Sequence, residues 1–350
     1  MAEIEVLKSH THHIDSDYID KKSQARPGIK VFPDKLYVIT TISNPVRYRS
    51  RYELYRAFEE HMKDSGAVLY TVEMAFGDRR YECTEADDPR DIRLRSAFEL
   101  WHKENMINIG ISRLPPNWKY VAWIDADTLF TRPDWCQETL HQLQHYQIVQ
   151  LFSQAQDIGP NYEALNIFDS FAHSYREGRP LPYDRHGHFY PYFKGGDKWK
   201  WHSGYAWAAR REAIDHLGGL MDYAILGSAD HNMAAALVGC VEKSLDHRVH
   251  PNLLKRMKIW QERADRLVRR NIGLVEGLLI HYWHGSKVNR GYVDRWKILV
   301  ENQYNPECDI KRDWQGLYQL VDNGTPRSIK LRDGIRRYFR QRREDSIDID

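Results

Sequence analysis

Two acidic residues separated by one alanine follow directly on an apolar run of the chain. The run is YVAWI at residues 120–124, and the acidic residues are Asp125 and Asp127. In an extended segment alternate side chains point to the same side, so both carboxylates could face one cation. Alternatively, one carboxylate binds the cation and the other binds a ribose. Carboxylate oxygens suit Mg²⁺ or Mn²⁺, which also coordinate diphosphate oxygens. The interpretation without chemistry is an acidic turn after a strand.

A second cluster, HYWHGSK at residues 281–287, also follows an apolar run and is continued by Arg290. A histidine of this run, His281 or His284, could complete the metal shell. Lys287 and Arg290 are expected to neutralise a leaving diphosphate, the arginine with bidentate geometry. The glycine inside the cluster permits close approach of the backbone. Either histidine taken alone fits a hydrogen-bonded core imidazole better, but together with the glycine and the two cations they favour a site.

A polar loop, SNPVRYR at residues 43–49, follows the first predicted strand. Asn44 and Arg47 at the carboxyl end of a strand could bind the base and the phosphates of a nucleotide. Tyr48 could stack on that base. The alternative is a loop that only caps the next helix.

Two further segments are candidates for the sugar and the acceptor. WHSGYAW at residues 201–207 is expected to form a strand edge, with Trp207 against the donor sugar. Asp230 follows a Gly-Ser loop and opens a predicted helix. It could be the N-cap of that helix, or the general base that deprotonates an acceptor hydroxyl. Both roles can hold together.

The elements that carry these residues alternate between strand and helix. We expect strands at residues 36–42, 67–72, 120–124 and 148–152, and helices at residues 52–62, 98–111 and 138–145. This order predicts an α/β fold with a mostly parallel central sheet flanked by helices. Residues 1–33 are expected to form an N-terminal arm, residues 34–295 the main domain and residues 296–350 a helical extension. Residues 159–200 are expected to be a loop-rich region facing the substrate.

Composition and charge narrow the classes of function. The chain of 350 residues is 42% hydrophobic and 29% charged, with a formal net charge of +2. Such a chain has no global field that attracts nucleic acid or a membrane. No apolar run approaches the roughly 20 residues that span a bilayer, and the N-terminus lacks the apolar region of a signal peptide. We therefore expect a soluble, cytoplasmic protein without a membrane partner.

The C-terminal segment is rich in arginine. Its apolar residues recur every four positions, which predicts an amphipathic basic helix at residues 327–343. This helix either packs on the body with a solvated basic face or contacts a phosphate backbone.

Together the Asn/Arg loop, the DxD after an apolar strand, the Gly/Trp segment, the acidic loop-helix and the late HxxHG resemble those of GT-A glycosyltransferases. The resemblance covers roughly residues 35–295. It implies a GT-A, Rossmann-like domain, a Mn²⁺ or Mg²⁺ cofactor and a nucleotide-sugar donor, with a UDP-sugar favoured. It places Asp125 and Asp127 at the metal and donor, His284 as the third metal ligand, and Asp230 as base or acceptor contact.

The HYWHGSK run is also similar to the HxxGxxK signature of a retaining GT-A family, with the glycine displaced by one position. The whole chain resembles glycosyltransferases of tailed phages, some of which glycosylate hydroxymethylated pyrimidines in DNA. That likeness implies a glycan or modified DNA as acceptor, and the host cytoplasm as location for a phage-encoded protein.

Two other classes of function use the same residues. A metal-dependent phosphohydrolase or nuclease would use the carboxylates with water as nucleophile, but two-metal sites need more clustered carboxylates than the sequence offers. A non-catalytic nucleic-acid-binding protein would use the basic C-terminal helix, which the near-neutral net charge disfavours.

Overall fold

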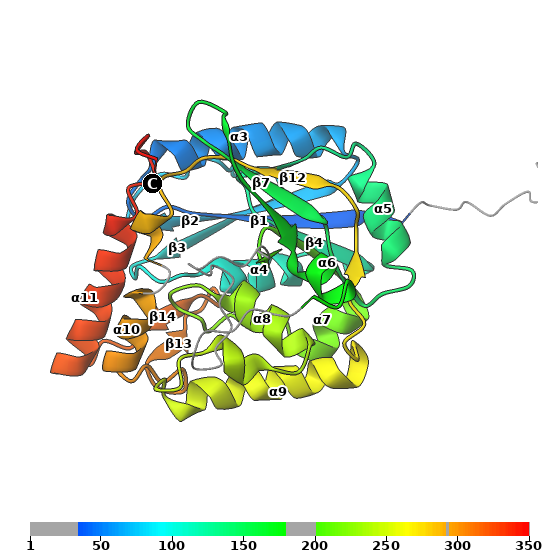
Figure 1. Ribbon diagram of the computed structural model, residues 1–350. Helices are drawn as coiled ribbons and strands as arrows, with labels where there is room; N and C mark the ends of the chain where they lie inside the picture. The colour runs from blue at the N-terminus through cyan, green and yellow to red at the C-terminus, as the bar shows by residue number, and fades with distance from the viewer. Residues whose placement is uncertain (1–33, 180–200, 292–293, 350) are drawn as a thin grey trace, which may run out of the picture. The chain divides into compact units, whose positions relative to one another are not determined.

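A seven-stranded sheet forms the centre of the computed structural model, which describes residues 34–179, 201–291 and 294–349 (Figure 1). The strand order is β11-β6-β10-β4-β1-β2-β3. The strands are β1 (Leu36–Ser43), β2 (Val68–Phe76), β3 (Asp91–Ser96), β4 (Tyr120–Ile124), β6 (Ile148–Gln150), β10 (Ala206–Arg210) and β11 (Gly273–Leu274). Strand β10 is antiparallel to both of its neighbours, and the other adjacent strands are parallel. The expected α/β class with a mostly parallel central sheet is therefore confirmed.

The helices cover both faces of this sheet. They are α3 (Arg49–Asp64), α4 (Lys103–Ser112), α5 (Trp135–Gln142), α6 (Phe171–Arg176), α7 (Arg211–Leu217), α8 (Ala229–Leu237), α9 (Pro251–Leu267), α10 (Asp294–Glu301) and α11 (Pro326–Gln341), with short 3₁₀ helices η1 (Val241–Ser244) and η2 (Val288–Arg290). In Figure 1, α3 lies above the sheet and α4, α7, α8 and α9 lie below it. The helix expected at residues 98–111 begins only at Lys103.

Strand β1 shows how the sequence specifies this layering. Its alternate residues divide between two core clusters. Leu36 and Val38 pack with side chains of α3 and α5, whereas Tyr37 and Ile39 pack with side chains of α4, α7, α8 and α9. Because side chains of a strand alternate between its faces, a run of apolar residues that are all buried requires cover on both faces.

A second, five-stranded sheet was not expected from the sequence. Its order is β5-β12-β7-β8-β9, with β5 (Thr128–Phe130), β12 (Leu278–His281), β7 (Gln154–Ile158), β8 (Ala164–Ser170) and β9 (Trp201–His202). Strand β8 and helix α6 lie in the region predicted to be loop, so that prediction is wrong for residues 164–176. Most side chains of β8 are exposed or half-buried, and its sequence, ALNIFDS, therefore lacks a clear apolar pattern. The remaining part of that region, residues 180–200, lies outside the described residues, as does the N-terminal arm.

The residues after 295 contribute to the main core. Helices α10 and α11 flank a hairpin of β13 (Ile310–Arg312) and β14 (Tyr318–Leu320). Leu299, Tyr304 and Leu317 belong to the core cluster that lines the lower face of the main sheet. Helix α11 buries Leu331, Ile335, Tyr338 and Phe339, which confirms the predicted amphipathic helix.

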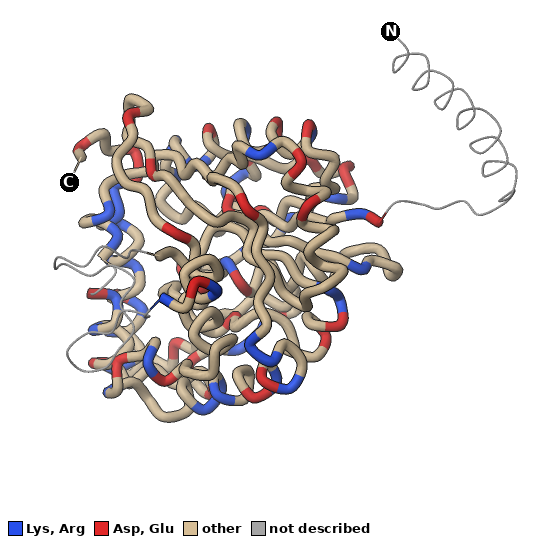
Figure 2. The backbone as a smooth tube through the Cα atoms, turned by 45° about the vertical axis from the view of Figure 1, so that its right-hand side comes forward, with Lys and Arg blue, Asp and Glu red and all other residues tan. Residues whose placement is uncertain are grey.

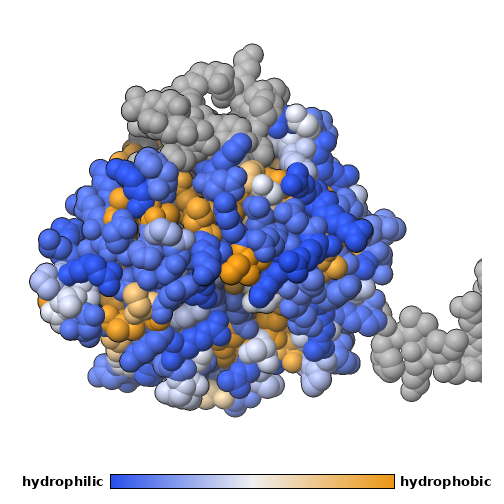
Figure 3. Space-filling view, turned by 90° about the horizontal axis from the view of Figure 1, so that it is seen from below, coloured by the Kyte–Doolittle hydropathy of each residue, from blue (hydrophilic) through white to orange (hydrophobic). Residues whose placement is uncertain are grey.

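Four of the eight basic residues of α11 and the segment after it form ion pairs within the described part of the chain. Arg327 pairs with Asp309, Arg332 with Asp322 and Asp333, Arg340 with Glu99, and Arg342 with Glu344. Figure 2 shows basic and acidic residues interspersed along α3 and α9. The face that carries α9 is mainly hydrophilic, with small separate apolar areas (Figure 3). These pairings favour a helix that packs on the body over one that binds a phosphate backbone. Within the described part of the chain, no helix combines the length and the apolar character needed to cross a bilayer.

Candidate functional site

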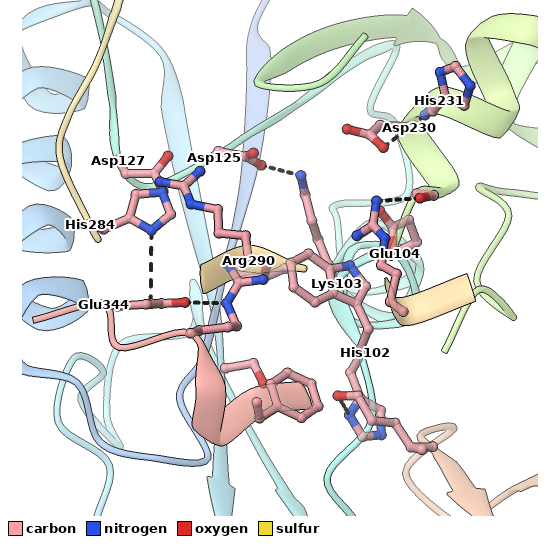
Figure 4. A pocket seen from close by; sticks show the side chains of 18 of the residues that line it. His102, Lys103, Glu104, Asp125, Asp127, Asp230, His231, His284, Arg290 and Glu344 are labelled. Atoms are coloured by element: carbon pink, nitrogen blue, oxygen red, sulfur yellow. Dashed lines mark hydrogen bonds and ion pairs between the residues drawn. The ribbon is translucent and has the colours of Figure 1, made fainter. Parts of the chain in front are cut away.

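A cavity of about 630 Å³ lies where β1 and β4 end. It is lined by the loop after β1, the turn after β4, the first turns of α4 and α8, and the end of the chain (Figure 4). Parallel strands present their carboxyl ends at one edge of a sheet, which is where α/β proteins bind ligands. The cavity therefore has the position that the alternation of elements predicts for a functional site.

The acidic pair after β4 lies in a turn that carries the chain from the main sheet to the second sheet. The Thr128 hydroxyl donates a hydrogen bond to the Asp125 carbonyl at 2.8 Å, which closes this turn. Because the segment is not extended, the two carboxylates diverge. Asp125 forms an ion pair with Lys103 of α4, whereas Oδ2 of Asp127 lies 3.1 Å from Nε2 of His284. The arrangement with both carboxylates at one cation is not what the structure shows.

Asp127, His281 and His284 form a cluster with the chemistry of a metal site. One ligand atom from each residue lies within 4.8 Å of the others. The two Nε2 atoms are 3.2 Å apart. Since imidazole nitrogens bind first-row cations at about 2.0–2.1 Å, two of them on one cation lie roughly 3 Å apart. Oδ1 of Asp127 is buried and has no hydrogen-bond partner among the described residues. These three side chains therefore fit a bound divalent cation.

Pairing of β12 with its neighbours assembles this cluster. His281 is the register partner of Thr128 in β5 and of Asp157 in β7. The Tyr282 amide donates a hydrogen bond to the Asp127 carbonyl at 2.9 Å. The second sheet thus brings Asp127 beside His281 and His284, which follow it by about 150 positions in the chain.

Asp157 holds the His281 ring in the form that a metal ligand needs. Its Oδ1 lies 2.8 Å from Nδ1 of His281, so that Nδ1 carries the proton and Nε2 presents a lone pair to the cluster. Asp157 also forms an ion pair with Lys287 and accepts a hydrogen bond from the Tyr205 hydroxyl at 3.3 Å. Burial opposes ionisation, but His281 and Lys287 together hold the pKa of Asp157 well below its ordinary value. Asp157 is therefore a carboxylate at neutral pH.

His284 is neutral at physiological pH. Burial, followed by the positive charge of Arg290, lowers the pKa of His284 to about 4. Burial alone would raise the pKa of Asp127, but His284, His281 and Arg51 hold it well below its usual range. A neutral imidazole and an ionised carboxylate are the protonation states in which these residues bind a cation.

The end of the chain closes the site behind His284. Glu344 is 1% exposed, and its Oε2 lies 3.9 Å from Nδ1 of His284. Both carboxylate oxygens of Glu344 accept hydrogen bonds from Arg51, and Arg342 donates a further one at 2.5 Å. A Cβ at Gly285 would lie 2.8 Å from the Arg343 carbonyl oxygen and from the Glu344 Cα. The glycine thus permits close backbone approach, as expected, but to the C-terminal segment of the same chain.

Asp230 lies on the other side of the cavity, in the first turn of α8. Ser228 occupies the N-cap position, so the N-cap interpretation of Asp230 is wrong. Its Oδ1 instead accepts a hydrogen bond from the His231 amide at 2.8 Å. Burial would raise the pKa of Asp230, but Lys103, followed by His202, leaves it below its ordinary value. Asp230 therefore presents an ionised carboxylate to the cavity.

The other predicted residues divide between the cavity and the protein body. Asn44 lines the cavity, but its side chain is hydrogen-bonded to the backbone N–H and C=O of Tyr48, so it also closes its own loop. Arg290 lines the cavity and is 6% exposed. Arg47, Trp207 and Lys287 are not among the described residues that line it.

The contacts of Arg47, Trp207 and Lys287 explain why these side chains do not line the cavity. Arg47 points to Glu82, at 3.1 Å. Trp207 lies on the central strand β10, is buried in the core, and donates its indole N–H to the Ser203 carbonyl. Lys287 pairs with Asp157.

Four residues of the site were not identified from the sequence. They are His281, to which the resemblance assigned no role, and Asp157, Lys103 and Glu344. His281 carried a signal, because it precedes His284 by three residues in the same motif. Asp157 and Glu344 carried none, since nothing near them in the sequence suggests a ligand or its support.

No protein-family model and no curated protein matches this chain. Its structure is similar to a mannosyltransferase from Pyrobaculum calidifontis in complex with GDP-Man and Mn²⁺, with 12% identity over 82% of this chain and 68% of that chain and a TM-score of 0.35. It is also similar to a Drosophila β1,4-galactosyltransferase 7 variant in complex with manganese, UDP-Gal and xylobiose, with 10% identity and a TM-score of 0.32. That match covers 70% of this chain and 65% of the galactosyltransferase chain.

A third similar structure is 4-diphosphocytidyl-2C-methyl-D-erythritol synthase from Anaerococcus prevotii, with 9% identity over 70% of this chain and 87% of that chain and a TM-score of 0.32. TM-scores of this size identify no family, and the function has to be inferred from the site residues.

Proposed function

We propose that this protein is a metal-dependent glycosyltransferase of the GT-A type, which moves a sugar from a nucleotide-sugar donor to an acceptor hydroxyl. The cluster of half-buried Asp127 with the buried His281 and His284, at the edge of the cavity, carries this proposal. Two imidazoles and one carboxylate suit Mn²⁺ better than Mg²⁺, which prefers an all-oxygen shell. A bound cation would stabilise the negative charge on the departing diphosphate.

The residues around the cluster divide the cavity into a donor side and an acceptor side. Arg290, beside His284, supplies a positive charge for the diphosphate. The loop after β1 with Asn44 receives the nucleotide. Asp125, paired with Lys103, lies where a carboxylate could bind the ribose. Asp230 faces the acceptor from the opposite wall. We propose a UDP-sugar as the first donor to test.

The other functions considered from the sequence are less well supported. Among the described residues, the metal cluster contains one carboxylate, that of Asp127. Two-metal hydrolases bind their two cations with several carboxylates. Most arginines of α11 are paired within the chain, which leaves less charge for a phosphate backbone. For the same reason we propose a glycan as acceptor ahead of a hydroxymethylated pyrimidine in DNA.

The test is release of free nucleoside diphosphate from a panel of UDP- and GDP-sugars, with Mn²⁺, with Mg²⁺ and with EDTA. We expect slow hydrolysis of one donor, faster with Mn²⁺ than with Mg²⁺ and absent with EDTA, because water replaces the acceptor. Hydrolysis that is insensitive to EDTA would contradict the metal assignment. A folded protein that neither binds nor hydrolyses any donor would contradict the glycosyltransferase assignment.

Gly204 determines where the Asp230 carboxylate lies. A Cβ at Gly204 would be 2.5 Å from Oδ2 of Asp230 and 2.8 Å from Cε1 of His202. We therefore expect Gly204→Ala to displace the carboxylate and to lower the rate of transfer by about 10–100-fold. Mn²⁺ affinity should change less than the rate of transfer, because Gly204 is not one of the three residues of the metal cluster. Steady-state kinetics and Mn²⁺ titration test this prediction, and an unchanged rate of transfer would contradict it.

A further inference from the structure

Glu104 is a buried carboxylate for which no other described residue supplies a hydrogen bond or an ion pair. It lies in the first turn of α4, lines the cavity and is 4% exposed. Among the described residues, no other residue donates a hydrogen bond to its side chain and no basic side chain lies within ion-pair distance; the hydrogen bond it accepts comes from its own backbone amide. A buried carboxylate in such a position costs folding free energy.

Apart from Asp127 of the metal cluster, whose Oδ1 has no hydrogen-bond partner among the described residues, the other buried carboxylates that the structure describes are satisfied. They are Glu73, Asp157, Asp222, Asp309 and Glu344, each held by arginine, lysine, histidine or backbone N–H groups. Outside the metal cluster Glu104 is the exception among the described residues, and it lines the cavity. A costly group in this position points to a role in binding or chemistry rather than in holding the fold.

The position of Glu104 places it on the acceptor side. In Figure 4, Glu104 and Asp230 lie on one side of the cavity and Asp127, His284 and Glu344 on the other, with Lys103 and Asp125 between them. The charges that act on Glu104 are Lys103 of its own helix, Asp230 of α8 and Asp125 of the turn after β4. An acceptor hydroxyl next to Asp230 would therefore also be near Glu104.

The two carboxylates differ in basicity. Asp230 accepts a hydrogen bond from a backbone amide, and Lys103 and His202 stabilise its ionised form, which makes it a weak base. Burial raises the pKa of Glu104 to about 8, with a further rise from the like charge of Asp230, although the positive charge of Lys103 acts in the other direction. A general base is most effective when its pKa lies near the working pH.

We propose that Glu104, rather than Asp230, accepts the proton of the acceptor hydroxyl, while Asp230 holds the acceptor by a hydrogen bond. This assignment rests on the proposed function. As the acceptor oxygen bonds to the anomeric carbon, its proton passes to a carboxylate oxygen of Glu104. The bond between that carbon and the phosphate oxygen breaks, and its electron pair leaves with the diphosphate. Such a single displacement inverts the anomeric configuration.

The experiment compares wild type with Glu104→Gln and Glu104→Asp, using the donor identified in the panel, Mn²⁺, and water as acceptor. Loss of a general base lowers a rate by about 10²–10⁴-fold, which is the loss expected for Glu104→Gln with unchanged Mn²⁺ affinity. In wild type the rate should rise with pH up to about 8, where Glu104 becomes ionised. This rise should be absent in Glu104→Gln and partly restored in Glu104→Asp.

A matched control is Glu99→Gln, the same substitution five positions earlier on a residue that pairs with Arg340 and is not among those that line the cavity. It should keep the wild-type rate and pH profile. If Glu104→Gln also stays within about threefold of wild type with the same pH profile, the assignment of Glu104 is wrong. Retention of anomeric configuration in the product would overturn it as well.

A stability measurement separates this role from a structural one. The pKa of Glu104 in the folded chain, about 8, lies above its ordinary value of 4.5. The stability of the fold therefore decreases as the pH rises from 4.5 to about 8, because the unfolded chain loses this proton first. Glu104→Gln is therefore expected to raise Tm at about pH 9, where wild type must bury the charge. A lower Tm would show that the carboxylate supports the fold, and would overturn the proposal.

The outcomes for the two proposals are distinguishable. If wild type hydrolyses no donor, the proposed function fails and the assignment of Glu104 fails with it. If wild type hydrolyses a donor with Mn²⁺ and Glu104→Gln behaves identically, only the assignment of Glu104 fails.

Discussion

Asp127→Asn is expected to abolish metal-dependent transfer while leaving the fold intact. Asp127 is the one carboxylate of the cluster, and its two partners are imidazoles. Its buried Oδ1 has no hydrogen-bond partner among the described residues, so in the absence of a cation this oxygen is unsatisfied. An amide cannot supply the negative charge. Because stabilisation by a cation is worth several kcal/mol, the rate should fall by about 10³-fold or more.

The measurement is release of nucleoside diphosphate together with Mn²⁺ titration calorimetry. The matched variant is Asp125→Asn, which removes the other carboxylate of the motif. Since Asp125 pairs with Lys103 and lies outside the three-residue cluster, this variant should keep its Mn²⁺ affinity in the absence of donor. Near wild-type turnover of Asp127→Asn would contradict the metal assignment. An equal loss of Mn²⁺ binding in both variants would instead place Asp125 in the metal shell.

Glu344→Ala is expected to destabilise the protein by about 3–5 kcal/mol, the cost of leaving a buried charge without its partner. The side chains of Glu344 and Arg342 are 1% and 5% exposed, and Arg51 is 27% exposed. The substitution would leave both arginines without their carboxylate. It would also release the segment that packs against Gly285, so a weaker Mn²⁺ site is expected as a second effect.

Urea denaturation measures this change as a shift in the free energy of unfolding. Glu53→Ala is the control, because Glu53 pairs with Arg49 on the exposed face of α3, where the side chains are 59% and 84% exposed. Breaking such a surface pair costs about 0.5 kcal/mol or less. If the two variants lose similar, small amounts of stability, the C-terminal ion pairs do not hold the site together.

Local patterns in the sequence were sufficient to predict the main elements of the fold. The apolar, β-branched run at residues 36–42 is strand β1, and the four-residue repeat of apolar positions near the C-terminus is helix α11. These predictions succeed because the side-chain period of a strand or helix is a property of a few consecutive residues. The position of Asp127 after β4 and of His284 after β12 followed from the same rule.

The direction of the side chains within each motif was less predictable. The spacing of Asp125 and Asp127 suggested that both could reach one cation, but a turn between two sheets separates them. Trp207 and Arg47 had the residue types expected of a donor site. The first instead packs in the core on β10, and the second points to Glu82. Residue type and spacing do not state which way a loop turns or which face of a strand is buried.

The sequence by itself thus determined an α/β fold with acidic residues at the end of β4 and a pair of histidines at the end of β12. The tertiary structure alone decided which residues make the site. Asp157 meets His281 because β7 and β12 pair in parallel with these two residues in register, 124 positions apart. Glu344 comes from the C-terminal segment, and Glu104 reaches the cavity from the first turn of α4. Such contacts depend on strand register and on long-range packing, which no stretch of neighbouring residues encodes.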